Sequence, residues 1–395
     1  MHIAVLFDRL GPYHRARLHA LGQRLSVTAV EVAGQSAEYD WDAVDATPSF
    51  DRITLYPNAD SGAVSTTALV GALHATLDEV CPDSVAIPGW SEPSALGALQ
   101  WCLSTKTPSI VMSASSAIDA TRVGWREWIK KRVVGQFDAG LVGGSLHRDY
   151  LVHLGVPRDR IFLGYDVVDN NHFYEGAEYA RREAIALRDR YGLPRRYFLD
   201  VCRFIPKKNI PRLLEAYAAY RDRAGSKAWD LVLVGDGPER DSVEERLTKY
   251  GLTDVVHLPG FVQYETLPIY YGLADAFVHA STREQWGLVV NEAMASGLPV
   301  LVSDHCGCAS DLVYPNENGL VFDPKKPSDI AISLFDVAHG SASLSLMGDA
   351  SRRIIEAWSP NRFAESLAAA AQAAQSEISP VSIWDRILLK ALIYR

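Results

Sequence analysis

Several features are scarce in this chain of 395 residues, and each scarcity excludes a class of protein. No window approaches the roughly 18 uninterrupted apolar residues that a membrane-spanning helix needs. The opening MHIAVLFDRL has neither the basic start nor the cleavage site of a signal peptide, and it reads as a strand. Five cysteines are too few and too scattered for a disulfide framework, and Cys306 and Cys308 are spaced too closely for a zinc knuckle. We therefore expect reduced thiols in a cytoplasmic protein.

Positive charge is also scarce, because 39 Lys and Arg against 48 Asp and Glu give a formal net charge of -9. A protein that binds nucleic acid regardless of sequence needs a basic stripe along the phosphates, so nucleic acid is not an expected partner. Hydrophobic residues make up 48% of the chain, which excludes a disordered protein. Single cores stop growing near about 250–300 residues, so the length favours two or three domains.

Short apolar runs alternate with amphipathic stretches in two blocks along the chain. Their near-continuous apolar character is typical of parallel strands buried on both faces. Repeated strand–helix–strand units predict an α/β protein with two doubly wound, Rossmann-like domains, over 1–175 and 176–378. The predicted strands are 2–7, 27–32, 53–56, 84–88, 109–113, 140–143 and 160–164, then 198–202, 231–235, 255–260, 276–280, 298–303 and 319–322.

The last segment, 379–395, departs from this alternation. Helical spacing places Trp384, Ile387, Leu388 and Leu392 on one face, with Arg386, Lys390 and Arg395 elsewhere. One interpretation is an amphipathic helix that packs back on the N-terminal domain. The other is an anchor at a membrane surface.

The strongest functional pattern follows the apolar run 276–280 and contains Glu284, Gly287 and Glu292. Open α/β sheets bind ligands at this end of their strands. A glycine there lets the backbone turn tightly, and the free N–H groups of a helix N-terminus attract a pyrophosphate. Carboxylates accept hydrogen bonds from the hydroxyls of a ribose or a hexose. The alternative is an ordinary helix that carries surface glutamates.

A second pattern, Arg203 with Lys208, directly follows the apolar run 198–202. Arg presents a planar fork to phosphate and Lys a point charge, so the two would stabilise a departing phosphate. A basic loop is otherwise a solvated face, and chemistry alone does not separate Lys207 from Lys208. The weaker signals are two glycine-containing loops, Gly235-Asp-Gly-Pro and Gly260-Phe261-Val262, either of which could be a simple turn.

Together these residues resemble the retaining glycosyltransferases of family 4, nucleotide-sugar enzymes with the GT-B fold, in which two domains face each other across a cleft. The resemblance covers the C-terminal half, and it includes Glu317-Asn-Gly-Leu-Val-Phe-Asp-Pro. It implies that Glu284 holds the donor sugar, Glu292 the ribose, and Arg203 with Lys208 the diphosphate, with no metal or other cofactor. Asp40-Trp-Asp42 spells a metal-binding DxD but lies in a polar loop, so we discount it. The expected further donor contacts are Gly11, Gly235, Phe261, Val262, Trp286, Gly287 and Leu288.

The N-terminal half should bind the acceptor. His14 and Arg15 follow the first strand, where they could meet acceptor or phosphate. Relatives place a histidine after the strand at 109–113, where this chain has serines, so a histidine role is in doubt. Ser115, Ser116 or Asp119 could supply hydrogen bonds instead. Arg122, Arg126 and Lys130 recur every four residues beside two tryptophans, which suits a solvated face, an anionic acceptor or a bilayer surface.

The sequence therefore predicts a retaining hexosyltransferase that moves a hexose from a nucleoside-diphosphate sugar to a hydroxyl acceptor. By the resemblance, the setting is polysaccharide or lipid-linked glycan assembly, with peripheral membrane contact at the inner face as an option. A GT-B sugar-nucleotide epimerase and a catalytically silent sugar-nucleotide-binding scaffold are the alternatives. A nicotinamide dehydrogenase is disfavoured because neither half begins with a strand followed by GxGxxG.

Overall fold

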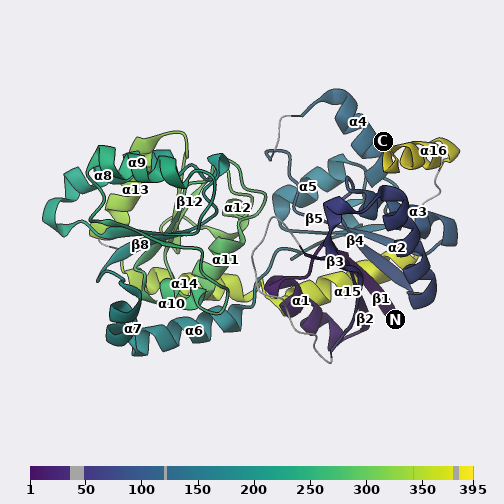
Figure 1. Ribbon diagram of the computed structural model, residues 1–395, viewed down its shortest axis with the longest axis horizontal. Coiled ribbons are helices and arrows are strands. Elements are labelled where there is room, and N and C mark those ends of the chain that lie inside the picture. Colours follow the sequence, from purple (N-terminus) through teal and green to yellow (C-terminus); the bar gives the residue numbers. More distant parts are fainter. Residues whose placement is uncertain (36–48, 120–121, 341, 377–381, 395) are drawn as a thin grey trace. The chain divides into compact units, whose positions relative to one another are not determined.

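The computed structural model describes residues 1–35, 49–119, 122–340, 342–376 and 382–394. The triplet Asp40-Trp-Asp42 lies outside these residues. The chain forms two compact units, one of Met1–Val167 with Pro360–Arg395 and one of Val168–Ser359 (Figure 1). These divisions differ from the predicted boundaries after residues 175 and 378.

The first unit contains a sheet of seven parallel strands in the order β3-β2-β1-β4-β5-β6-β7. Its strands are β1 His2–Phe7, β2 Ser26–Gln35, β3 Asp51–Asp60, β4 Ser84–Pro88, β5 Ser109–Ser113, β6 Ala139–Val142 and β7 Ile161–Leu163. Its helices are α1 Pro12–Gly22, α2 Thr66–Val80, α3 Pro93–Thr105, α4 Gly124–Val134, α5 Ser145–His153, α15 Pro360–Ser376 and α16 Ile383–Ile393.

The second unit contains six parallel strands in the order β10-β9-β8-β11-β12-β13. Its strands are β8 Tyr197–Val201, β9 Asp230–Val234, β10 Val256–Gly260, β11 Ala276–His279, β12 Val300–Ser303 and β13 Gly319–Phe322. Its helices are α6 Asn170–Arg182, α7 Ala184–Tyr191, α8 Ile210–Ala224, α9 Arg240–Tyr250, α10 Leu267–Leu273, α11 Leu288–Ala295, α12 Ala309–Leu312, α13 Pro327–His339 and α14 Leu344–Glu356.

Both sheets are buried by helices, as the apolar runs require. Leu6, Val85 and Val111 of the first sheet share a core with α3 and α5, and Leu231 and Val278 of the second share a core with α8 and α13. The prediction of two doubly wound, parallel-sheet α/β domains is confirmed. All five cysteines are free thiols.

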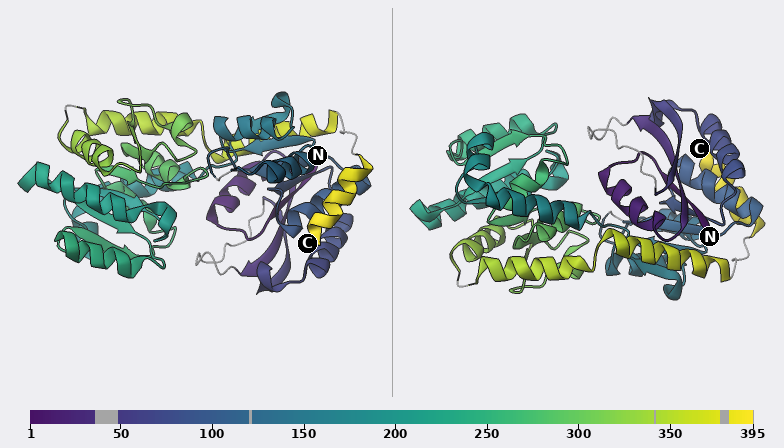
Figure 2. Two further views of the ribbon diagram at one scale, coloured as in Figure 1. Left: turned by 90° about the horizontal axis from the view of Figure 1, so that it is seen from above. Right: turned by 90° about the horizontal axis from the view of Figure 1, so that it is seen from below.

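The last two helices belong to the first unit. Helix α15 packs on β5, β6 and β7 beside α1, and Figure 2 shows it running along that sheet. Helix α16 packs on α3 through Leu389 and Ile393, which are buried. The helix face differs from the expected one, because Trp384 and Ile387 are exposed.

Among the described residues, no single helix is long and apolar enough to cross a membrane. A bent pair, Pro327–His339 with Leu344–Ser376, meets the requirement only when its two members are counted together.

Candidate functional site

The predicted site residues of the second unit lie in loops at the carboxyl ends of neighbouring strands. Strand β11 pairs with β8 on one side and β12 on the other, so the loops that follow these strands meet. Backbone hydrogen bonds join them: Thr282 N–H donates to the Lys207 carbonyl at 2.8 Å, and Glu284 N–H to the His305 carbonyl at 3.2 Å. The parallel topology thus brings the two strongest sequence patterns together.

Lys208 and Glu284 are the centre of this arrangement. The Lys208 ammonium donates to Glu284 Oε2 in an ion pair, and the two side chains are only 12% and 14% exposed. His279, at the end of β11, donates from Nδ1 to Asp200 of β8 at 2.9 Å. Its Nε2 lies 3.6 Å from Glu284 Oε2. His279 and Asp200 are fully buried.

The charges of this cluster stabilise one another. Burial raises the pKa of Glu284, but His279 and Lys208 outweigh it and hold that pKa far below its usual range. Burial lowers the pKa of Lys208, and the Glu284 carboxylate more than restores it. Likewise, Asp200 raises the pKa of His279 against the effect of burial. The cluster therefore presents an ionised carboxylate and an ammonium at neutral pH.

The structure separates the two lysines that the chemistry of the loop alone did not distinguish. Lys208 directs its ammonium to Glu284, whereas Lys207 contributes its carbonyl, which accepts from Thr282 N–H and from Ser281 Oγ at 2.9 Å. Arg203, which begins the same loop, is exposed. Asn209 closes the loop with a left-handed backbone (φ 62°) and donates to the Ala280 and Pro324 carbonyls.

Gly235 and Gly237 allow the loops after β8 and β9 to approach closely. At φ 132°, Gly235 would place a Cβ only 1.9 Å from the Cys202 carbonyl oxygen. A Cβ on Gly237 would lie 2.6 Å from the Phe204 carbonyl oxygen. Both glycines are therefore required by backbone packing, whether or not a ligand touches them.

Glu292 and Trp286 are buried side chains. Glu292 has no exposed surface and accepts a hydrogen bond from the Tyr271 hydroxyl at 2.6 Å. Glu292 therefore presents no exposed surface to a ribose in this structure. Trp286 is 2% exposed, its indole N–H donates to Asn291 Oδ1 at 2.9 Å, and its ring packs on Trp358. Since the side chain is occupied in this way, a contact of Trp286 with the donor would have to come from its backbone.

Of the remaining predicted donor contacts of this unit, Phe261, Val262 and Leu288 lie nearer the surface, whereas Gly287 is buried. Phe261 is 45% exposed and Val262 partly exposed, directly after Gly260, whose φ is 84°. Gly287 has φ 103° and caps α11, and Leu288 begins that helix, partly exposed.

In the first unit, Gly11 and His14 form the start of α1. Gly11 N–H donates to His14 Nδ1 at 3.1 Å, and the His14 ring packs on Phe7 at 4.3 Å. Burial and the Arg17 cation lower the pKa of His14 to about 3, so its imidazole is neutral at physiological pH. His14 thus offers no positive charge to a phosphate, whereas Arg15 is exposed.

The loop after β5 is held by its own hydrogen bonds. Ser115 N–H donates to Ser113 Oγ, and Ser116 N–H to Asp119 Oδ2, each at 3.0 Å. Ser115 and Asp119 are partly exposed.

Arg122 does not share a helix face with Arg126, because it precedes α4. Its guanidinium pairs with Asp119 and donates to the Tyr150 hydroxyl at 2.8 Å. The prediction that Arg122, Arg126 and Lys130 form one row on a helix is thus wrong for Arg122. Arg122 instead ties the β5–α4 loop to α5. Arg126 lies on α4, exposed, with its guanidinium 5.2 Å from the ring centre of Trp125.

Sequence reasoning missed Asp200 and His279. The signal was present, because each is a polar residue inside an apolar run that the pattern assigns to a buried strand. A buried ionisable side chain needs a partner, so the two could have been paired across adjacent strands.

Within the described ranges, no group of three or more His, Cys, Asp or Glu side chains is arranged to hold a metal ion.

Comparison with known proteins decides what this site resembles. Residues 187–353 match the family model of group 1 glycosyl transferases. This match lies within the second unit and includes Arg203, Lys208, Glu284 and Glu292. The segment that is similar to glycosyl transferases therefore contains the Lys208–Glu284 ion pair.

Two curated relatives illustrate the range of glycosyl transferases. Mannosylfructose-phosphate synthase of Agrobacterium fabrum is 28% identical over 213 residues, which are 52% of this chain and 46% of the relative. GDP-mannose-dependent alpha-(1-6)-phosphatidylinositol monomannoside mannosyltransferase of Mycobacterium tuberculosis is 32% identical over 192 residues, 46% of this chain and 49% of the relative. The chain thus matches about half the length of these relatives.

Solved structures show the fold over nearly the whole chain. Sucrose-phosphate synthase from Thermosynechococcus elongatus superposes with a TM-score of 0.71 at 20% identity, covering 93% of this chain and 97% of that one. Anabaena HepE in complex with UDP gives a TM-score of 0.68 at 16% identity, covering 93% and 98%. The fold is GT-B, as predicted.

Proposed function

We propose that this chain is a retaining hexosyltransferase of family 4 that uses a nucleoside-diphosphate sugar and a hydroxyl acceptor. The observation that carries the proposal is the Lys208–Glu284 ion pair at the carboxyl edge of the second sheet, inside the segment that matches group 1 glycosyl transferases. This edge is where open α/β sheets take their ligands.

Each polar group of the site has a task in this reaction. The Glu284 carboxylate, held ionised, accepts hydrogen bonds from hydroxyls of the donor sugar. Lys208 and Arg203 bind the diphosphate, whose negative charge grows as the glycosidic bond breaks, so they favour the transition state over the ground state. When the diphosphate binds, Lys208 shares its charge between a phosphate oxygen and Glu284.

His279 and Asp200 support this machinery without touching the donor. The buried Asp200–His279 pair fixes the imidazole beside Glu284 and so favours one position of the carboxylate. The proposed ribose contact of Glu292 requires a movement that exposes its carboxylate, because that side chain is buried. The first unit is proposed to bind the acceptor. We also propose that no metal or other cofactor is needed and that the reaction takes place in the cytoplasm, in polysaccharide or lipid-linked glycan assembly.

The test is donor binding followed by product analysis. Thermal-shift screening of UDP-, GDP- and ADP-sugars should find one donor that raises Tm, and Lys208→Met should abolish that rise while Lys207→Met keeps it. The best donor, incubated with a panel of hydroxyl acceptors, should release its nucleoside diphosphate and form an α-glycoside from an α-linked donor. Inversion would contradict the family 4 assignment. Epimerisation of the donor without an acceptor would instead favour the epimerase, and binding without any turnover would favour the silent scaffold.

A further inference from the structure

The first unit exposes a group of large apolar side chains on α4 and α16. Trp125 and Trp128 of α4 are 62% and 58% exposed, and Trp384 of α16 is 72% exposed. Ile383 and Ile387 of α16 are exposed as well. Single exposed hydrophobic residues are ordinary, but several large ones on two neighbouring helices indicate an interaction site. We call these five residues and the cations around them the α4–α16 surface.

The contacts of Arg132 show that the exposed tryptophans of α4 lie close to Trp384 of α16. Its guanidinium lies 5.7 Å from the ring centre of Trp128, and its Nε donates to Asp385 of α16 at 2.6 Å. Asp385 directly follows Trp384. The exposed tryptophans of the two helices therefore flank one ion pair.

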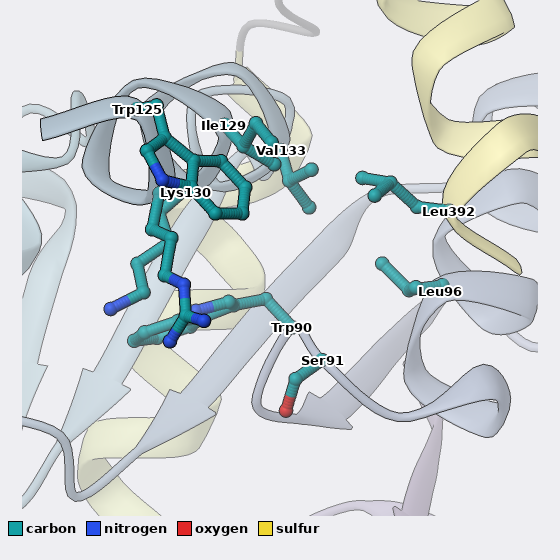
Figure 3. A pocket seen from close by; sticks show the side chains of 9 residues that line it. Trp90, Ser91, Leu96, Trp125, Ile129, Lys130, Val133 and Leu392 are labelled. Atoms are coloured by element: carbon teal, nitrogen blue, oxygen red, sulfur yellow. The ribbon is translucent and has the colours of Figure 1, made fainter. Parts of the chain in front are cut away.

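A pocket of about 400 Å³ opens between α4, α16 and the loop after β4. Figure 3 shows Trp125, Ile129 and Val133 of α4 on one side, with Leu96 and Leu392 opposite them. Trp90, Ser91, Arg126 and Lys130 complete the lining. The pocket is thus mainly apolar, and Arg126 and Lys130 add two cations to its lining.

The charge of this surface is opposite to that of the whole protein. Helices α4 and α16 carry six Lys and Arg against Glu127 and Asp385, in a chain of net charge -9. Glu127 pairs with Lys130, and Asp385 with Arg132. In the part of the chain that the structure describes, the other four cations form no ion pair. They are Arg126, Lys131, Arg386 and Lys390, and all are exposed.

We propose that the α4–α16 surface binds an anionic lipid bilayer and that the pocket accepts an acyl chain of one lipid. Tryptophan prefers the boundary between headgroups and acyl chains, and Lys and Arg beside it attract anionic headgroups. A small anionic ligand would not require several exposed tryptophans outside the pocket. The proposal does not depend on the donor site, because every residue of the surface belongs to the first unit and lies outside residues 187–353, which match group 1 glycosyl transferases.

The test is sedimentation of the full chain with vesicles. We expect binding to phosphatidylcholine vesicles that contain phosphatidylglycerol, and much weaker binding to phosphatidylcholine alone. Lys131→Glu with Lys390→Glu should lower the partition coefficient at least about tenfold at low salt, because each cation near an anionic membrane contributes separately. Trp125→Ser with Trp384→Ser should lower it by a similar factor, at low and at high salt. Quenching of tryptophan fluorescence by lipids brominated in the acyl chain should fall in Trp125→Phe.

Matched controls lie on the second unit. Lys249→Glu removes an exposed cation of α9, and Ile185→Ser removes an exposed apolar side chain of α7, so both should bind vesicles like the wild type. The proposal is overturned if the wild type does not bind anionic vesicles, if it binds neutral ones equally well, or if the surface variants bind as the controls do. Donor-induced thermal shifts in the same variants should stay at wild-type values, which separates a failure here from a failure of the proposed sugar transfer.

Discussion

Replacing Lys208 by Met removes the ammonium from the ion pair with Glu284 and keeps most of the apolar stem. Both side chains are largely buried, so the carboxylate loses an ion-pair partner in a place where water can replace it only in part. Loss of one partner of a fully buried pair costs about 3–5 kcal/mol. Since the side chains keep 12% and 14% exposure and His279 stays 3.6 Å from Glu284, we expect a loss of about 2–3 kcal/mol for Lys208→Met.

Hydrogen exchange at increasing urea concentrations, read on peptides from β8 and β11, would measure this change for the second unit alone. A double-mutant cycle with Glu284→Gln should give a coupling energy of about 2 kcal/mol. Lys207→Met, on the same loop, is the control and should stay within about 0.5 kcal/mol of the wild type. If Lys208→Met also stays within about 0.5 kcal/mol, or if the cycle shows no coupling, the reasoning about a buried pair is refuted.

Three further predictions concern pH, backbone packing and metal. Asp200 raises the pKa of His279 above 6.5 despite burial. The imidazolium therefore stabilises the fold fully below about pH 6.5. This contribution is lost as the pH rises through the pKa of His279 in the folded state. The stability advantage of the wild type over His279→Gln should therefore shrink towards alkaline pH in urea titrations, and an increase would contradict the assignment. Gly235→Ala should lower the free energy of unfolding by about 3 kcal/mol or more, because its Cβ would collide with the Cys202 carbonyl oxygen. The control is Gly71→Ala on the open face of α2, which should not lower the free energy of unfolding. Turnover should be unchanged after dialysis against EDTA, and a loss that Mg²⁺ or Mn²⁺ restores would contradict the proposed metal-free reaction.

Most of the fold could be predicted because parallel strands buried on both faces leave a simple signal. Apolar runs located strands from β1 to β13, and their alternation with helices gave two doubly wound sheets. The return of α15 to the first unit could not be predicted, because its Ala-rich face would suit either core. Only long-range packing decides which sheet it covers.

For the candidate site, the sequence could predict which loops come together but not the contacts between their side chains. The spacing of Glu284 and Lys208 after two strands pointed to one edge of the sheet, which the topology brings together. Pattern alone could not show that Lys208 rather than Lys207 reaches the carboxylate, since this depends on the turn that ends at Asn209. Nor could it show that Glu292 is buried against Tyr271.

The central claim is that the Lys208–Glu284 site binds a nucleoside-diphosphate sugar and transfers its hexose. Isothermal titration of the wild type, Lys208→Met and Lys207→Met with the donor found by thermal-shift screening tests this claim most directly. The account predicts that Lys208→Met weakens binding of the donor and of the free nucleoside diphosphate by at least about tenfold, as expected for a lost charge-assisted contact, while Lys207→Met binds like the wild type. Equal affinity of all three proteins for the donor would contradict it.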